Sequence, residues 1–240
     1  MKSNKFYSRI AAGLEAMNIE YQEYMIDQLQ DYLKFLKEEN KKYNLTALDE
    51  PDEIITKHFF DSLSFLSKFN LKQEKFIDIG TGAGFPGMVI KIFKPGLDMI
   101  LLDSLAKRVN FLKKLSTRLG LKKLEVVHAR AEDLARDKIY REGFDWVVAR
   151  AVAPVNTLSE YTLPLVRLNG KAVFFKGPGY KEELQEAQNA LAILGGRLKD
   201  TIKVKVPDLK GERYLVLIEK DSSTPEKYPR RAGIPKKRPL

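Results

Sequence analysis

From residue 75 onward the chain alternates short apolar segments rich in β-forming residues with helical periods, and this alternation constrains the fold more than any other feature. The clearest helical period runs from Leu105 to Leu119 and is followed by Gly120, a residue typical of helix C-termini. Such alternation predicts a doubly wound parallel sheet, an α/β fold with helices on both faces. The five strands that we expect here are KFIDIG (75–80), DMILLD (98–103), LEVVHA (124–129), FDWVVAR (144–150) and GKAVFFKG (170–177).

The two ends of the chain differ from this alternating region. Only five residues separate DTIKVKV (200–206) from ERYLVLIE (212–219), too few for a parallel crossover, so we expect an antiparallel hairpin. No strand pattern precedes residue 75, where apolar spacing predicts helices over about residues 20–42 and from Pro51 to about Lys68. The expected parts are a helical N-terminal extension (1–70), a sheet domain (71–222) and a basic C-terminal tail (223–240).

The composition excludes several kinds of site. The 240 residues include no cysteine and two histidines, His58 and His128, so disulfides and thiolate metal sites are impossible and a zinc site is not expected. The apolar runs are shorter than a membrane span, and the N-terminal sequence MKSNKFYSRI shows no secretory leader. We expect a monomeric cytoplasmic protein that binds neither a membrane nor a metal.

The net charge of +10 favours a polyanionic partner, although good solubility alone would also explain it. The C-terminal stretch EKYPRRAGIPKKRPL (226–240) concentrates this charge, with one acid, Glu226, among six cations. Its three prolines and one glycine make a packed helix unexpected, so we predict a flexible tail that contacts a phosphate backbone. These cations are Lys227, Arg230, Arg231, Lys236, Lys237 and Arg238.

A glycine turn, IDIGTGAGFPG (77–87), follows the first strand of the sheet and opens its first helix. Its glycines fit G-x-G-x-x-G, the fingerprint of dinucleotide-binding folds. Asp103 ends the second strand 19 residues after Gly84, where a carboxylate can hold the two hydroxyls of a ribose. Together these features predict an adenosine-containing ligand, whereas each alone could be a plain tight turn or a helix cap.

The charge of Asp78 distinguishes between two adenosine-containing ligands, NAD and S-adenosylmethionine. It lies beside the turn, and a pyrophosphate about 4 Å away would cost on the order of 4 kcal/mol at an effective dielectric of about 20. S-adenosylmethionine has no phosphate and carries an ammonium and a sulfonium, so the same carboxylate would attract it. The charge therefore favours S-adenosylmethionine over NAD, unless Asp78 only bonds backbone amides of the loop.

Several longer motifs resemble one family, the bacterial 16S rRNA guanine-N7 methyltransferases once named glucose-inhibited division protein B. The resemblance runs in order from about residue 43 to the C-terminus and implies a seven-stranded, Rossmann-like methyltransferase sheet whose last strand is antiparallel. It also implies methylation of N7 of a guanine in the decoding-region loop of 16S rRNA, on free rRNA or on an assembling small subunit, with S-adenosylhomocysteine as product. The motifs, beside the glycine turn, are YNLTAL (43–48), HFFDSL (58–63), LLDSLAKRVNFL (101–112), ARAED (129–133), ARAVAP (149–154), FFKG (174–177) and YPRRAGIPKKRPL (228–240).

The chemistry agrees with this resemblance. Methylation of cytosine C5 needs a cysteine nucleophile, which the chain lacks, and exocyclic-amine methylases usually carry Asn or Asp before Pro-Pro where this chain has ARAVAP. Guanine N7 has a lone pair and no proton to lose, so alignment suffices and no general base is assigned. A non-catalytic RNA-binding factor would show the same absence. That factor and an NAD-dependent oxidoreductase are the alternatives.

The expected site residues follow from the motifs. Arg150 and Lys176, at the ends of two strands, are candidates for positioning the substrate. His58 and Asn44 could be structural or could contact RNA; we favour a bridge from the extension to the sheet for His58 and a capping role for Asn44. The cofactor-binding candidates are Asp78, Gly80, Gly82, Gly84, Phe85, Asp103, Ser104, Leu105, Ala131, Glu132 and Arg150. The RNA-binding candidates are Lys176, Arg130, Arg230 and Arg231.

Overall fold

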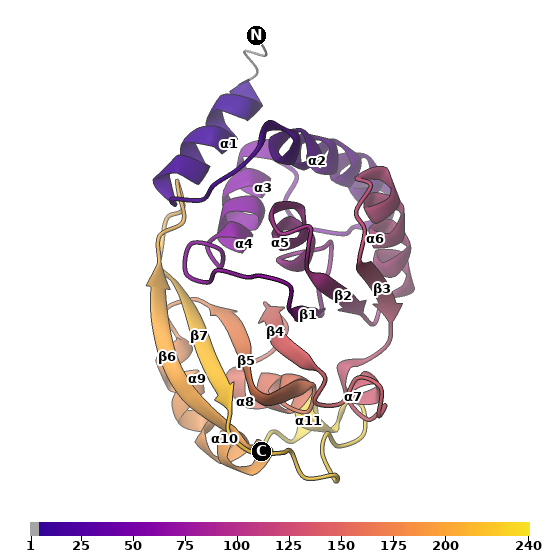
Figure 1. Cartoon of the computed structure of the whole chain (residues 1–240), viewed down its shortest axis with the longest axis vertical. Coiled ribbons are helices and arrows are strands. Elements are labelled where there is room, and N and C mark those ends of the chain that lie inside the picture. The colour runs from indigo at the N-terminus through magenta and orange to yellow at the C-terminus, as the bar shows by residue number, and fades with distance from the viewer. Residues whose placement is uncertain (1–4) are drawn as a thin grey trace.

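The computed structural model describes residues 5–240, and its centre is a seven-stranded sheet in the order β3-β2-β1-β4-β5-β7-β6 (Figure 1). Strands β1 to β5 are parallel, whereas β7 runs antiparallel to both β5 and β6. The strand order reverses at β1, and open parallel sheets bind ligands at such a switch point. The strands are β1 (Lys75–Ile79), β2 (Asp98–Asp103), β3 (Leu124–His128), β4 (Phe144–Arg150), β5 (Val166–Lys176), β6 (Gly196–Val204) and β7 (Arg213–Lys220).

Two hydrophobic cores lie on the two faces of this sheet. Neighbouring residues of one strand point to opposite faces, so Phe76 joins the first core and Ile77 the second. The first core is covered by α1 (Lys5–Ala16), α2 (Glu23–Tyr43), α3 (Pro51–Ile54), α4 (Asp61–Leu63), α5 (Gly87–Phe93) and α6 (Ala106–Arg118). The second is covered by α7 (Ala131–Leu134), α8 (Val155–Thr162), α9 (Tyr180–Glu186) and α10 (Gln188–Leu194), with the short α11 (Ile234–Lys237) against α8.

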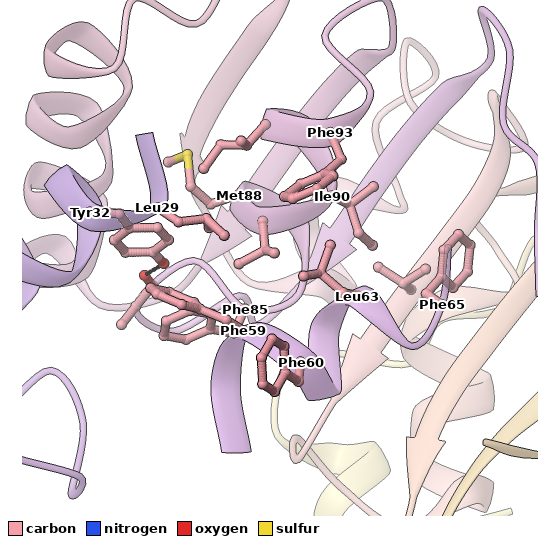
Figure 2. Packing of buried hydrophobic residues seen from close by; sticks show 14 of the residues in the cluster. Leu29, Tyr32, Phe59, Phe60, Leu63, Phe65, Phe85, Met88, Ile90 and Phe93 are labelled. Atoms are coloured by element: carbon pink, nitrogen blue, oxygen red, sulfur yellow. Dashed lines mark hydrogen bonds between the residues drawn. The ribbon is translucent and has the colours of Figure 1, made fainter. Parts of the chain in front are cut away.

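The N-terminal helices form part of the first core rather than a separate layer. Figure 2 shows Tyr32 of α2 beside Phe59 and Phe85, and the rings of Tyr32 and Phe85 are stacked with centroids 5.3 Å apart. A side chain at Gly13 of α1 would place its Cβ 2.2 Å from the ring of Phe60, so only glycine allows this approach. The extension is therefore packed against the glycine turn of the sheet domain.

The sequence predicted most of these elements. Both helices of the extension and all seven strands are present, and the C-terminal hairpin is antiparallel as expected. The helix expected from Pro51 to about Lys68 ends earlier, at Leu63, and contains one wide π-helical turn (η1, Ile55–Phe60), a kind of irregularity common at functional sites. Helix α1 was not predicted.

The expectation of a flexible, unpacked C-terminal tail is wrong. Tyr228, Pro229 and Pro235 are buried, and the segment contains the short helix α11. Its carbonyl groups accept hydrogen bonds from two arginines on the sheet domain: Arg136 donates to Pro229 O, and Arg141 donates to Tyr228 O and Thr224 O. These partners are distant in sequence, so the prolines fix the course of the chain over the domain instead of releasing it.

Within residues 5–240, no helix combines the length and the apolar character that crossing a membrane would require.

Candidate active site

A cavity of about 610 Å³ opens at the C-terminal ends of β1, β4 and β5. The glycine turn forms one wall, and the ends of β4 and β5 form another with Arg150, Lys176 and Gly177. The extension closes it with residues from the loop after α2 and from η1. The candidates on the turn thus meet those at the strand ends in one cavity.

Two of the three predicted glycines of the turn, Gly82 and Gly84, are required for different structural reasons. Gly80, Gly82 and Gly84 all have positive φ, at +65°, +63° and +104°. A Cβ at Gly82 would meet nothing within 4 Å, so its backbone lies open to an approaching ligand. A Cβ at Gly84 would lie 2.6 Å from the Tyr32 hydroxyl, which donates to Ala83 O, so this glycine serves the packing of α2.

Asp78 is inside the turn and does not line the cavity. Its side chain is fully buried, and Oδ2 accepts hydrogen bonds from Thr81 Oγ1 (2.6 Å) and from Gly87 N (2.7 Å). Burial raises the pKa of Asp78 to about 7, against the opposing effect of these two bonds. The arrangement matches the alternative in which Asp78 bonds groups of the loop, and the charge argument against a pyrophosphate weakens accordingly.

Asp103 connects the turn to the start of α6. Its carboxylate, 2% exposed, accepts hydrogen bonds from Gly82 N (2.9 Å) and Leu105 N (2.9 Å), with Arg108 Nη1 more distant at 3.4 Å. A carboxylate has about four acceptor positions, so one remains for a hydroxyl. The neighbouring candidates, Ser104 and Leu105, are exposed, and the apolar Leu105 side chain offers a surface for a flat ring.

The two candidates on α7 are both buried. Ala131 is 9% exposed. Glu132 is 4% exposed, and its Oε1 accepts a hydrogen bond from Gly233 N (2.8 Å) of the C-terminal segment. The Glu132 carboxylate therefore holds that segment in place, and its predicted contact with an adenine edge stays a prediction. Arg130, just before the helix, is exposed.

The Arg150 guanidinium contacts residues of both η1 and α4. Its Nη1 donates to Asp61 Oδ2 (2.6 Å) and to Lys57 O (2.9 Å), and Nη2 lies 3.1 Å from His58 Nδ1. The guanidinium also lies over the ring of Phe85, 5.4 Å from its centroid. Arg150 thus joins the extension to the sheet at the edge of the cavity.

His58 is a half-buried neutral group in this network. Its Nε2 lies 2.9 Å from Thr46 Oγ1, and its ring stacks on Phe85 with centroids 4.3 Å apart. Burial, and then the charge of Arg150, lowers the pKa of His58 to about 3. These contacts fit the favoured bridging role. Asn44 ends α2 in the left-handed conformation, with its N–H bonded to Asn40 O, which fits the expected capping role.

Lys176 projects from the end of β5 beside an acid that the sequence did not single out. Its Nζ donates to Ala153 O (2.8 Å) and to Glu183 Oε2 (2.6 Å). Glu183 of α9 lines the cavity and also accepts from Val155 N (2.9 Å). Three further cations line the cavity and were not predicted, because nothing in their local sequence distinguishes them from surface charges: Lys57, Arg108 and Arg213.

The cations of the C-terminal segment are not equivalent. The Arg230 guanidinium is bound to the buried carboxylate of Glu160, with Nη2 to Oε2 at 2.6 Å. Arg231, by contrast, is exposed. The other exposed cations here are Lys227, Lys236, Lys237 and Arg238. The predicted RNA contact of Arg230 would therefore have to form beside its bond to Glu160. No cluster of three or more His, Asp or Glu side chains suited to a metal occurs within residues 5–240.

Comparisons with known proteins agree with this geometry. A family model described as rRNA small subunit methyltransferase G matches residues 25–214. The chain is 48% identical over 239 residues to the ribosomal RNA small subunit methyltransferase G of Carboxydothermus hydrogenoformans, covering 100% of this chain and 99% of that protein. It is 45% identical over 229 residues to the protein of the same name from Alkaliphilus oremlandii, covering 95% and 96%. The crystal structure of a SAM-dependent methyltransferase from Aquifex aeolicus has the same fold, with a TM-score of 0.54 at 21% identity over 74% of this chain and 97% of that one.

Proposed function

Given that the chain belongs to the family of rRNA small subunit methyltransferase G, we propose that it methylates N7 of a guanine in the decoding-region loop of 16S rRNA. It is an S-adenosylmethionine-dependent rRNA methyltransferase by this membership, and an NAD-dependent oxidoreductase is not favoured. A cytoplasmic monomer acting on rRNA or on an assembling small subunit is the form that we expect. The extension (1–70), the sheet domain (71–222) and the C-terminal segment (223–240) would act as one packed unit.

The residues of the turn fit this cofactor. The open backbone at Gly82 and the remaining acceptor position of Asp103 suit a bound nucleoside, and exposed Leu105 suits its base. When bound, S-adenosylmethionine supplies a methyl group on a positively charged sulfur. Asp78, Glu132 and Arg150 have protein partners of their own, so we assign them to shaping the site. Gly80, Gly84, Phe85, Ser104 and Ala131 complete the proposed set.

The chain needs only to orient guanine N7, because that nitrogen already carries a lone pair. No base is required, and His58, the histidine at the cavity, has a pKa of about 3 and Arg150 beside its Nδ1. Arg150 and Lys176 hold the wall against which a base would be aligned, a task of proximity and orientation. Exposed Arg130 and Arg231 would contact phosphates outside the cavity.

One observation carries this proposal: a single cavity joins a glycine turn suited to a nucleoside cofactor with a wall of cations suited to RNA. The test is transfer of tritium from labelled S-adenosylmethionine to small-subunit rRNA, with the modified nucleoside identified by mass. We expect 7-methylguanosine. A different modified nucleoside would correct the target atom, and the absence of transfer to both rRNA and small subunits would favour the non-catalytic RNA-binding factor.

A further inference from the structure

The pair Lys176–Glu183 stands out among the groups that line the cavity. Lys176 ends β5, Glu183 lies on α9, and the short loop 177–179 connects the two elements. The ammonium and the carboxylate are 2.6 Å apart, and the Lys176 side chain is 10% exposed whereas that of Glu183 is 31% exposed. The carboxylate therefore faces the cavity, anchored at its base by the ammonium.

The anchoring leaves hydrogen-bonding capacity on both groups. A lysine ammonium has three N–H donors, and those of Lys176 are engaged by Ala153 O and by Glu183 Oε2, so one remains. Glu183 Oε2 also accepts from Val155 N, whereas within residues 5–240 no hydrogen bond reaches Glu183 Oε1. The pair thus offers the cavity one donor next to at least two acceptor positions.

The other carboxylate among the cavity-lining residues, Asp61, is less accessible. Its side chain is 6% exposed and lies between two arginines, with Arg150 Nη1 at 2.6 Å from Oδ2 and Arg213 Nε at 3.3 Å from Oδ1. Asp61 Oδ1 accepts no hydrogen bond from the described part of the chain, residues 5–240, but it is buried beside Arg213. Glu183, whose side chain is 31% exposed, is the more accessible acceptor.

A donor followed by two acceptors is complementary to the Watson–Crick edge of one base. Guanine presents there the acceptor O6, then the donors N1–H and N2–H₂. Adenine presents a donor followed by an acceptor. Its donor would face the donor of Lys176, and its acceptor would face the carboxylate of Glu183. Uracil and cytosine each end this edge on a carbonyl oxygen, which would face the carboxylate. Single-stranded RNA bases are commonly read on this edge.

Resting on the proposed function, we propose that Glu183, positioned by Lys176 and Val155 N–H, selects the target guanine by accepting hydrogen bonds from N1–H and N2–H₂, while Lys176 donates to O6. N7 belongs to the other ring and takes no part in this edge, so recognition leaves the reacting atom unobstructed. Glu183 is in this view a specificity-determining residue.

The test replaces the methylated guanine, once located by mass mapping, with inosine by ligating a synthetic segment into the rRNA. Inosine keeps O6, N1–H and N7 and lacks only the N2 amino group. The wild-type kcat/KM should be roughly 10-fold or more lower for inosine than for guanine, because a hydrogen bond to a charged acceptor is lost. Glu183→Gln should reduce this ratio severalfold, and Glu183→Ala should bring it close to 1.

Glu182→Gln is the matched control, since it makes the same change of charge on an exposed neighbouring residue of α9 and should keep the wild-type ratio. A loss of fold or of cofactor binding would lower both rates without changing their ratio. An unchanged ratio in both Glu183 variants, or a wild-type enzyme that uses inosine as well as guanine, overturns this inference alone. A wild-type protein that methylates neither substrate overturns the proposed function as well.

Discussion

The glycine turn and the wall around Arg150 face the same cavity, but different interactions stabilise them. In the turn, Asp78 bonds Thr81 and Gly87, residues within nine positions along the chain, and Gly82 bonds Asp103 of the adjacent strand. In the wall, Arg150 bonds Lys57, His58 and Asp61, 89 to 93 positions away in the extension. The turn is thus held mainly by bonds within the sheet domain, with Tyr32 donating to Ala83 O as the contact from the extension, whereas the bonds of Arg150 all depend on the docked extension.

The largest effect on stability should come from removing the ion pair between Arg150 and Asp61. Arg150→Met removes the main partner of buried Asp61 and should lower the free energy of unfolding by about 3 kcal/mol, as expected for a broken buried pair in which one partner, Arg213, remains. Arg213→Met removes the more exposed partner of the same carboxylate and should cost about 1 kcal/mol or less. Denaturant unfolding measures both; equal losses would show that Arg150 does not dominate the wall.

Breaking the turn should instead weaken cofactor binding. Asp103→Ala removes the acceptor proposed for the ribose and the bond to Gly82 N, and we expect S-adenosylmethionine affinity to fall by roughly 1.5–3 kcal/mol. Calorimetry measures the change, with Asp98→Ala, at the exposed start of the same strand, as a control that should leave affinity unaltered. Tight binding of NAD to the wild-type protein would contradict the proposed cofactor.

Cations outside both regions should act on RNA affinity alone. Replacing Arg231, Lys236, Lys237 and Arg238 by glutamine should lower the slope of log affinity against log salt by roughly 0.7–0.9 for each phosphate that the protein no longer neutralises. Arg230 is kept, since it is bound to Glu160. Four exposed lysines of α2, α6 and the loop before β3, changed in the same way, are the control: Lys34, Lys41, Lys113 and Lys122. Equal slopes in the two variants would mean that RNA does not meet the C-terminal segment preferentially.

The smallest expected effect concerns the free energy of unfolding, to which Asp78 and His58 give opposite pH dependences. The folded-state pKa of Asp78 is raised from 3.8 to about 7, so its contribution to stability is complete below pH 3.8 and is lost as the pH rises toward 7. The folded-state pKa of His58 is lowered from 6.5 to about 3, so its contribution is complete above pH 6.5 and is lost as the pH falls toward 3. Between about pH 4 and 6.5 the two slopes oppose each other.

Replacing either Asp78 or His58 should reveal the slope of stability against pH that the other residue causes. His58→Gln should make stability fall more steeply with rising pH in this window, and Asp78→Asn should make it rise. Urea midpoints at several pH values measure this. If neither variant differs in slope from the wild-type protein, the two groups do not titrate as their burial implies.

The two regions also differ in what the sequence could predict. The positive φ angles of the turn require glycine, and its supporting acid lies in the same motif, so local spacing was sufficient. A strand-end arginine such as Arg150 needs a partner for its charge, but Asp61 lies 89 positions earlier and no local pattern identifies it. Glu183 was missed for the same reason, because an acid on a partly exposed helix resembles any surface acid.

Hydrogen-bond partners that are distant in sequence also explain why the C-terminal segment was wrongly expected to be flexible and unpacked. Prolines and cations in sequence indicate an extended, solvated chain, because they disfavour helices and cores. Here Arg136 and Arg141 satisfy the carbonyl groups of the segment, and Glu160 neutralises Arg230. These partners lie 70 to 93 positions from the groups that they bind.

The bond between Glu132 and Gly233 has a consequence for the order of synthesis. The two residues are 101 positions apart, and Glu160 likewise precedes its partner Arg230 by 70. At a synthesis rate of about 5–20 residues per second, Glu132 waits roughly 5–20 s for Gly233 to be made. During that interval the two carboxylates lack the C-terminal partners that they have in the folded protein. The C-terminal segment (223–240) therefore completes the second core after the rest of the sheet domain has been made.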